Sequence, residues 1–372
     1  MTGWFSDTAI FGHDTLVNNV AGYESFLAKY DSNGNVLWAK QTTGHSSDNY
    51  CEVSYLSTDV QGNVYLTGAY QDTVTFGYLS LVTSVNKANA FLAKYNSNGS
   101  IIWAKQPQFC ISNTTSGNAV TTDASGNIFM TGIFQGILRL DMYKLYSPYT
   151  APFLIKYDTY GNVSWAAQGY SQSSADSSNS NSVVTDKYGN IYITGNYKGN
   201  LTLDKYNLTT KLSANAFIAK YDANGNIKWV QHSADINNNT WSGNSVSCDT
   251  LNHIYLAMGC NDNRVNNNCV IAFGADSFMI NGNKSGDVSG LIEFDTAGKA
   301  ICGSLTTTGG DDLNTVACDP SGKYVYFGGD LWQPAVFGTD TFAFTDPEVP
   351  LLVRWQSCTT IIDTIPTDTL PP

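Results

Sequence analysis

The chain has 372 residues and a net charge of −12, yet only 13% of its residues are charged and 13% are aromatic. So much aromatic surface excludes a disordered chain, and aromatic residues favour strands over helices. The negative charge argues against a nucleic-acid partner, and no apolar run reaches the roughly 18 residues of a membrane span.

A repeated segment organises the chain. It reads TDVQGNVYLTG at residues 58–68 and has five copies, in which the aspartates are 64, 63, 63 and 70 residues apart. A second repeated segment reads FLAKYDSNGNVLW at residues 26–38. An apolar residue also recurs eight positions after the Thr-Gly pair, as in Phe11 and Phe76. The whole chain is therefore an array with a period near 64 residues.

Each repeated segment is predicted to be a β-hairpin. The FLAKY run alternates with the period of a strand, and in D-x-x-G the aspartate can bond its own backbone while glycine accepts the positive φ of the turn. Two hairpins give each unit four strands, which we call A to D. About six such units predict an all-β protein, a β-propeller built from four-stranded blades.

The ends of the array are expected to be incomplete. Met1 aligns with Leu66 in the middle of strand B, so the first unit lacks strand A, and the last unit loses strand D after Trp355. We therefore expect an incomplete ring from a longer product with an upstream signal peptide, although residues 1–14 show no such signal. The predicted units are 1–42, 43–107, 108–169, 170–233, 234–304 and 305–357, followed by a Thr- and Pro-rich linker or tail at 358–372.

The two ends of the blades differ in sequence. The A–B and C–D turns are short and repeat closely, whereas the D–A and B–C connections, at the opposite end, are long and unlike one another. Variable loops on a rigid frame are the usual place for recognition, although they can also serve only to solvate the rim. The candidate contacts on this long-loop face are Tyr50, Phe109, Trp241, Asp311, Asp312 and Trp332.

The combined motif D-x-x-G-N-x-Y-x-T-G and A-F-x-A-K-Y-D-x-x-G-N-x-x-W resembles the bacterial SBBP β-propeller repeat. The resemblance extends from Thr2 to about Ser357. It implies a secreted or surface-attached bacterial protein. The family name implies seven blades, and the family has no shared catalytic residues to carry over.

Several polar and cysteine residues could carry chemistry but also fit structural roles. The turn aspartates could be read as calcium ligands, but hairpin turns explain them without a metal. The loop from Cys260 to Cys269 is a candidate for metal or ligand binding, and a disulfide across it is the favoured explanation. Cys248 and Cys318 hold equivalent positions and are either a disulfide or two buried thiols. We assign no catalytic residue, metal or cofactor.

These observations favour a secreted or cell-surface binding or structural module. Its partner would be an unknown protein, peptide or glycan, with no nucleic acid and no membrane span. The alternative is a hydrolase or lyase acting on polysaccharide, which requires at least two loop carboxylates to converge within about 10 Å. The carboxylates available for this are Asp48, Asp176, Asp235, Asp311 and Asp312.

Overall fold

The computed structural model describes residues 1–19, 22–44, 51–83, 87–107, 109–111, 114–211, 213–234, 239–261, 270–273, 276–279, 288–305, 311–319, 324–331, 335–337, 340–342, 349–355 and 363–364. In this part of the chain the regular elements are all β-strands, which confirms the predicted all-β class. None of these residues belongs to a helix long and apolar enough to cross a membrane. The chain divides into two compact units, unit 1 (Met1–Ser171) and unit 2 (Gln172–Pro372).

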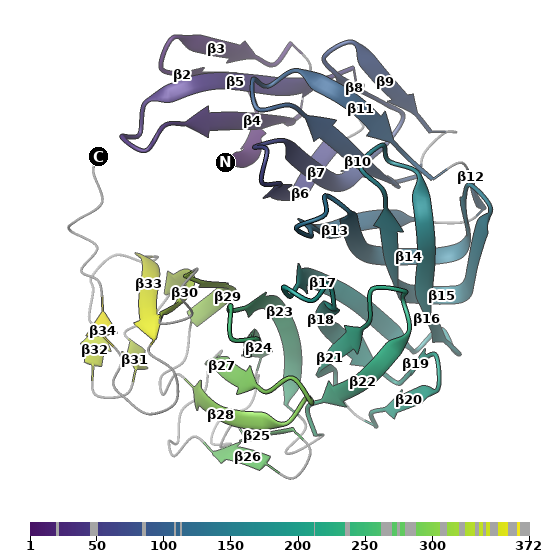
Figure 1. Ribbon diagram of the computed structural model, residues 1–372, viewed down its shortest axis with the longest axis vertical. Helices are drawn as coiled ribbons and strands as arrows, with labels where there is room; N and C mark the ends of the chain where they lie inside the picture. Colours follow the sequence, from purple (N-terminus) through teal and green to yellow (C-terminus); the bar gives the residue numbers. More distant parts are fainter. Residues whose placement is uncertain are drawn as a thin grey trace. The chain divides into compact units, whose positions relative to one another are not determined.

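Unit 1 contains blades 1 to 3 (Figure 1). Blade 1 has strands B, C and D in the order β1–β4–β5, blade 2 is β6–β7–β10–β11, and blade 3 is β13–β14–β15–β16. The strands are β1 (Thr2–Phe5), β2 (Thr8–Phe11), β3 (Asp14–Val17), β4 (Glu24–Tyr30), β5 (Val36–Thr43), β6 (Cys51–Thr58), β7 (Val64–Tyr70), β8 (Thr73–Phe76), β9 (Leu79–Val82), β10 (Asn89–Tyr95), β11 (Ile101–Lys105), β12 (Phe109–Ile111), β13 (Thr115–Thr122), β14 (Ile128–Leu140), β15 (Tyr143–Tyr157) and β16 (Val163–Ser171).

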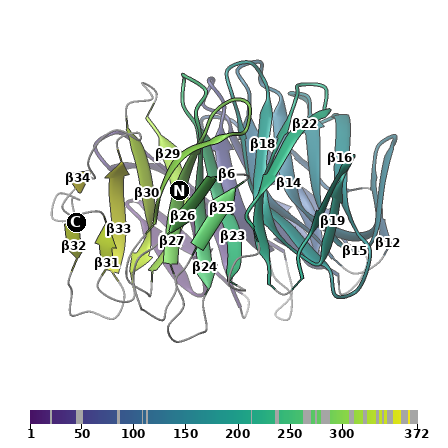
Figure 2. The same cartoon turned by 90° about the horizontal axis from the view of Figure 1, so that it is seen from below.

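Unit 2 contains blades 4 to 6, which are β17–β18–β21–β22, β23–β24–β27–β28 and β29–β30–β33–β34. Within blade 5, β23, β24 and β27 run side by side in Figure 2. The strands are β17 (Ser177–Thr185), β18 (Ile191–Lys198), β19 (Asn200–Leu203), β20 (Tyr206–Thr209), β21 (Asn215–Tyr221), β22 (Ile227–His232), β23 (Thr240–Cys248), β24 (Ile254–Asn261), β25 (Val270–Phe273), β26 (Asp276–Met279), β27 (Val288–Phe294), β28 (Ala300–Leu305), β29 (Asp311–Cys318), β30 (Val325–Leu331), β31 (Ala335–Phe337), β32 (Asp340–Phe342), β33 (Val349–Trp355) and β34 (Asp363–Thr364).

The core of each unit lies between neighbouring blades. The B strand β7 and the C strands β10, β21 and β27 are buried along their whole length. Leu92 of blade 2 shares a core cluster with Phe153 of blade 3, and Ile218 of blade 4 shares one with Leu256 of blade 5. Because both faces of a blade are covered, few positions remain for charged side chains, which explains their low share in the sequence.

The repeated Thr-Gly pair of strand B has a packing role. The Thr194 hydroxyl donates a hydrogen bond to the carbonyl oxygen of Phe217 in strand C (2.6 Å), and the equivalent threonines of blades 2 and 3 do the same. A Cβ atom on Gly195 would overlap the carbonyl oxygen of Asn179 in strand A. The pair therefore ties strand B to strand C while leaving room for strand A.

The threonine of one blade also packs closely against strand A of the next blade. A Cβ atom on Gly243 of blade 5 would overlap the hydroxyl oxygen of Thr194 in blade 4, and the same relation holds between blades 3 and 2. In blade 5 the threonine position is taken by Ala257, which pairs with strand C in the same register. Strand A of blade 6 has Leu313 where blade 5 has Gly243.

The A–B and C–D turns form as the sequence predicts. Oδ1 of Asp123 accepts hydrogen bonds from the backbone N–H groups of Ser125 and Asn127, both at 2.9 Å, and Gly126 has a φ of 79°. The turn interpretation is confirmed, since the carboxylates are occupied by their own backbone. The same bond from the backbone N–H four residues later is accepted by Asp31, Asp59, Asp158, Asp186, Asp222, Asp249 and Asp295.

The B–C connections differ from the prediction of open loops. They contain further hairpins, β2–β3, β8–β9, β19–β20, β25–β26 and β31–β32, while in blade 3 strands β14 and β15 extend to form one. In blades 1 and 2 the recurring apolar residue after the Thr-Gly pair anchors the hairpin on strand C. The ring centroids of Phe76 and Phe91 are 5.0 Å apart, and those of Phe11 and Phe26 are 4.7 Å apart.

The ends of the array agree only in part with expectation. Among the described residues, blade 1 has no strand A, and β1 lies at the edge of its sheet. The predicted loss of strand D from the last unit is wrong, because β34 pairs with β33 through Thr364 opposite Val353 and Asp363 opposite Arg354. A short polar segment of the predicted tail thus covers the edge of β33, which would otherwise expose unpaired backbone groups.

Candidate functional site

The structure describes the six predicted contacts to different depths. Trp241, in β23, is described with its side chain. Tyr50 and Trp332 lie outside the described residues. Phe109, in β12, and Asp311 and Asp312, in β29, are described by their backbone alone.

Trp241 is not the exposed contact that we expected. Its side chain is 0% exposed, in a core cluster with Tyr192, Ala216 and Met258 between blades 4 and 5. Side chains along a strand alternate between its faces, and Trp241 has the parity of Gly243, which lies against blade 4. The indole is therefore directed into the joint between the two blades rather than outward.

Polar atoms without hydrogen-bond partners gather beside Trp241. Among the described residues, eight buried side-chain nitrogen and oxygen atoms have no partner, and six of them belong to four residues at this joint. The four residues are Ser213, Asn215, Asn239 and Trp241. They lie at the starts of strands C and A, which is the long-loop end of blades 4 and 5.

Glu24 begins strand C in blade 1, the position that Asn215 holds in blade 4. Its side chain is 3% exposed, and its Oε2 accepts a hydrogen bond from Nε2 of Gln41 at 3.0 Å. Burial raises the pKa of Glu24 to about 7, against the opposing effect of the Gln41 bond. The folded state therefore holds a proton that the unfolded chain releases at about pH 4.

We expect the stability of unit 1 to depend on this proton. The contribution of Glu24 to the free energy of unfolding is complete below about pH 4 and is lost as the pH rises through 7. Glu24→Gln should raise the free energy of unfolding by about 2 kcal/mol at pH 8 and make it less dependent on pH. Urea unfolding from pH 4 to 8 measures both effects. Glu52→Gln, at an exposed position of β6, is the control. The same pH slope in both variants would contradict the assignment.

Of the five carboxylates named for the enzyme alternative, Asp176 alone is described with its side chain. Asp176 accepts hydrogen bonds from the backbone N–H groups of Gln172, Ser173 and Asn200 at 2.9, 2.8 and 3.1 Å. Burial raises the pKa of Asp176, but these bonds outweigh it and the pKa is lowered. This carboxylate thus stabilises a D–A connection. Of the others, Asp48 and Asp235 lie outside the described residues.

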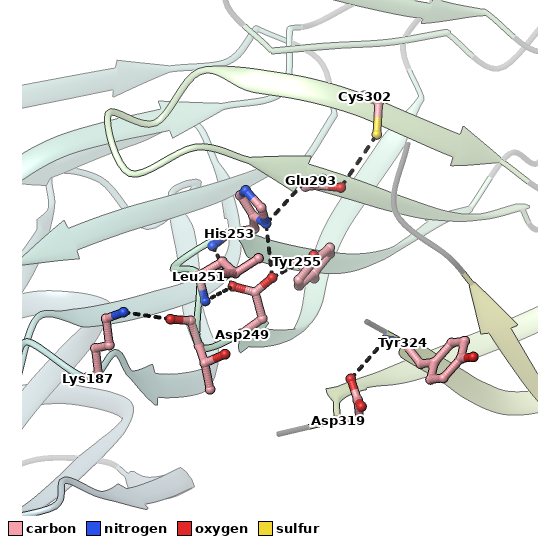
Figure 3. Close-up of polar contacts among 10 residues, drawn as sticks. Lys187, Asp249, Leu251, His253, Tyr255, Glu293, Cys302, Asp319 and Tyr324 are labelled. Carbon is pink, nitrogen blue, oxygen red and sulfur yellow. Dashed lines mark hydrogen bonds and ion pairs between the residues drawn. The ribbon is translucent and has the colours of Figure 1, made fainter. Parts of the chain in front are cut away.

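The tight-turn end of blade 5 carries an ionisable cluster that the sequence analysis did not identify (Figure 3). His253 Nδ1 lies 3.0 Å from Asp249 Oδ2 and 3.7 Å from Glu293 Oε1, and the two carboxylate side chains are 0% and 3% exposed. The Tyr255 hydroxyl donates a hydrogen bond to Asp249 Oδ2 at 3.1 Å. Burial, with the charges of Glu293 and Asp249, raises the pKa of Tyr255 above its usual range, so the phenol remains a donor.

The cluster occupies strand positions at which blade 4 carries hydrogen-bond donors that reach the next blade. In blade 4, Nζ of Lys220 and Nε1 of Trp229 both donate to the carbonyl oxygen of Thr296 in blade 5, at 3.2 and 3.1 Å. The same strand positions in blade 5 are Glu293 and Cys302. Cys302 is disulfide-bonded, and its Sγ lies 3.8 Å from Glu293 Oε2. The change from lysine to glutamate within the repeat was the signal that could have revealed this site.

A double-mutant cycle tests the cluster. His253→Asn, which restores the residue of blade 4, leaves Asp249 and Glu293 without the imidazole and should cost about 2 kcal/mol of unfolding free energy. Adding Glu293→Lys should recover most of this loss, a coupling of about 1–2 kcal/mol. Both quantities are measured by denaturant unfolding. Additive effects of the two substitutions would contradict a direct interaction.

Within the described residues, no group of three His, Cys, Asp or Glu side chains could hold a metal ion. Cys248 and Cys318 are thiols rather than a disulfide, but they are half-buried and not fully buried as the second predicted alternative had it. Burial raises the pKa of each to about 12. Cys260 is a buried thiol, so the disulfide predicted between Cys260 and Cys269 is wrong. The reason is that Cys260 packs in the core cluster of blades 4 and 5.

Sequence reasoning also missed a row of bulged asparagines. Each strand A of unit 2 shifts register by one residue, and the extra residues are Asn181, Asn244 and Asn314. Asn181 Nδ2 donates to the carbonyl oxygen of Gly243 at 3.0 Å, and Asn244 Nδ2 donates to Oδ1 of Asn314 at 2.7 Å. The row links the A strands of blades 4, 5 and 6. Its signal was an asparagine five residues before the repeated aspartate.

Antiparallel sheets recurring with the sequence repeat define a repeat β-propeller protein. The chain is similar to an uncharacterised WD repeat-containing protein of Acanthamoeba polyphaga mimivirus, with 27% identity over 276 residues. The match covers 62% of this chain and 19% of the viral protein, so the chain spans about a fifth of that relative's length. No family model matches the chain.

Proposed function

We propose that the chain is a secreted or cell-surface binding module of the SBBP type, which holds its ligand on the long-loop face. One observation carries the proposal. The turn aspartates at the opposite end bond their own backbone, whereas the unpartnered buried polar atoms gather beside the D–A connection that enters β23. Buried polar groups normally have partners, so such a concentration favours a bound ligand.

Loop replacement tests the binding face. The full chain is screened against a printed panel of glycans and a panel of peptides, and hits are measured by biolayer interferometry. Replacing residues 172–175 and 235–238 by Gly-Ser linkers should weaken binding at least about tenfold. The control replaces Ala223 and Asn224, in a tight turn of blade 4, by Gly-Ser. Equal losses in loop and control variants would contradict the proposed face.

The location is tested separately. Support for it comes from the resemblance to repeats of secreted and surface-attached bacterial proteins. We expect the protein in the culture medium, or on intact cells within reach of added protease. Recovery only from the cell interior, protected from protease, would contradict this part of the proposal.

A further inference from the structure

We propose that one copy of the chain packs blade 6 against blade 1 of a second copy, so that the protein associates head to tail. The inference goes beyond the proposed function, because it assigns two surfaces that lie apart from the long-loop face. Each of these surfaces carries the side chains of one half of an interblade joint, and on each of them these side chains are exposed.

The joint between blades 1 and 2 shows how two blades fit together. Leu27 in strand C of blade 1 shares a core cluster with Phe91 and Tyr95 in strand C of blade 2. Nζ of Lys29 donates to the carbonyl oxygen of Ser97, in the C–D turn of blade 2, at 2.9 Å. The lysines of blades 2 and 4 donate to the next blade in the same way. One blade thus offers leucine and a cation, and the next blade receives them with aromatic side chains and a turn carbonyl.

The receiving half of such a joint is exposed in blade 1. Leu27 packs against blade 2, so the alternating residues Phe26, Ala28 and Tyr30 lie on the opposite side, which we call the end face of blade 1. The core cluster on this face contains residues of blade 1 alone. Tyr30 is 37% exposed, whereas Tyr95, at the same position in blade 2, is 3% exposed.

The C–D turn of blade 1 is uncovered as well. A Cβ atom on Gly34 would meet nothing within 4 Å in the described part of the chain. At the equivalent Gly99 of blade 2 a Cβ atom would lie 2.8 Å from the indole of Trp38 in the preceding blade. Among the described residues, blade 1 therefore lacks the neighbour that covers this turn in blade 2.

Blade 6 carries the offering half of a joint. Val353 and Trp355 share a core cluster with blade 5, so Leu352 and Arg354 lie on the opposite side with Tyr326, which we call the end face of blade 6. Leu352 is 41% exposed, whereas the leucine or isoleucine at this position is 4% exposed or less in each of the other five blades. Tyr326 is half-buried, whereas the aromatic residue at its position is fully buried in blades 2 to 5.

The two end faces match, which favours a second copy as the partner. In the repeat, Leu352 holds the position of Leu27, and Arg354 holds that of Lys29. Blade 6 therefore offers to a second copy the side chains that blade 1 offers to blade 2. The carbonyl oxygen of Ser32 holds the turn position that accepts the lysine in blade 2, and it would accept an N–H of the guanidinium. Because each copy uses two different faces, the contact is heterologous and can continue from copy to copy.

Sedimentation velocity of the full chain tests the association. Dimers and larger species should increase between about 1 and 200 µM protein. Tyr30→Glu and Leu352→Glu should each weaken association at least about tenfold, because each places a charge in an apolar contact. The matched control is Ile102→Glu, in strand D of blade 2. Ile102 is 43% exposed but lies on neither end face, so association should not change.

A mixture of the two variants tests the head-to-tail geometry. Tyr30→Glu keeps the end face of blade 6 intact, and Leu352→Glu keeps that of blade 1. Their mixture should form dimers and nothing larger, because one intact contact remains between the two chains. Failure of the mixture to associate, when the unmodified chain does, would indicate a symmetric contact of one face with itself and overturn the proposal.

Two further results would overturn the proposal. The first is a monomer at every concentration. The second is a lower melting temperature in both variants with no dependence on concentration, which would assign the two end faces to a contact within one chain. Neither result bears on ligand binding at the long-loop face, which the loop replacements test separately.

Discussion

Gly195→Ala is expected to lower the free energy of unfolding of unit 2 by about 3 kcal/mol or more. A Cβ atom at this position would overlap the carbonyl oxygen of Asn179 and lie 2.9 Å from Cα of Ser180. These are backbone atoms of strand A, so no side-chain rotation relieves the overlap and the strand itself must move. Urea unfolding followed by tryptophan fluorescence measures the loss.

Gly3→Ala provides the matched comparison in blade 1. Gly3 holds the same position in the repeat, but a Cβ atom there would meet only the ring of Phe26, at 2.9 Å. Because a ring can shift, the expected loss is about 1 kcal/mol. Equal losses of unfolding free energy in Gly3→Ala and Gly195→Ala would show that close packing against strand A is not the reason for glycine at this position.

Asp186→Ala is expected to cost about 3 kcal/mol. Asp186 is 5% exposed and accepts hydrogen bonds from the backbone N–H groups of Tyr188 and Asn190, both at 2.9 Å. It also accepts from Asn190 Nδ2 at 2.7 Å and from the Tyr192 hydroxyl at 3.0 Å. Tyr192 is fully buried, so its hydroxyl would lose its acceptor where water cannot easily replace it.

Asp31→Ala separates the turn from the buried phenol. Asp31 makes the same turn bonds to Asn33 and Asn35, but these lie in an exposed turn and no tyrosine hydroxyl donates to Asp31 in the described hydrogen bonds. The loss in this variant should be clearly smaller than in Asp186→Ala. Denaturant unfolding of the two variants compares them directly, and equal losses would contradict the role given to Tyr192.

The blades could be predicted because the residues that specify their turns are close together in the sequence and recur along the chain. The aspartate and glycine of a turn such as Asp123 to Gly126 lie three residues apart and act on their own backbone. The hairpins between strands B and C were missed because strands such as Thr73–Phe76 are only 4 residues long. One aromatic side chain, Phe76, holds its hairpin through Phe91, and that contact exists only in the folded blade.

The candidate site could be predicted only in part. The long-loop end was recognised from the contrast between turns and loops, and Trp241 was chosen from that end. Its burial depends on strand parity and on the neighbouring blade, which one sequence does not reveal. The cluster around His253 was missed because its partner Glu293 lies 40 residues later, and each substitution alone resembles ordinary repeat drift.

The fit between Gly243 and Thr194 has a consequence for how such an array evolves. The strand-A position opposite this threonine holds glycine in blades 3 and 5 but Val53 in blade 2 and Ser180 in blade 4. Blade 5 has Ala257 at the threonine position, and blade 6 has Leu313 at the glycine position. A rearrangement that placed blade 6 directly after blade 4 would bring leucine to the space that Thr194 requires to be empty. The divergence at this joint thus acts against one particular rearrangement of the blades, because blade 6 cannot follow blade 4 without a new side chain at one of the two positions.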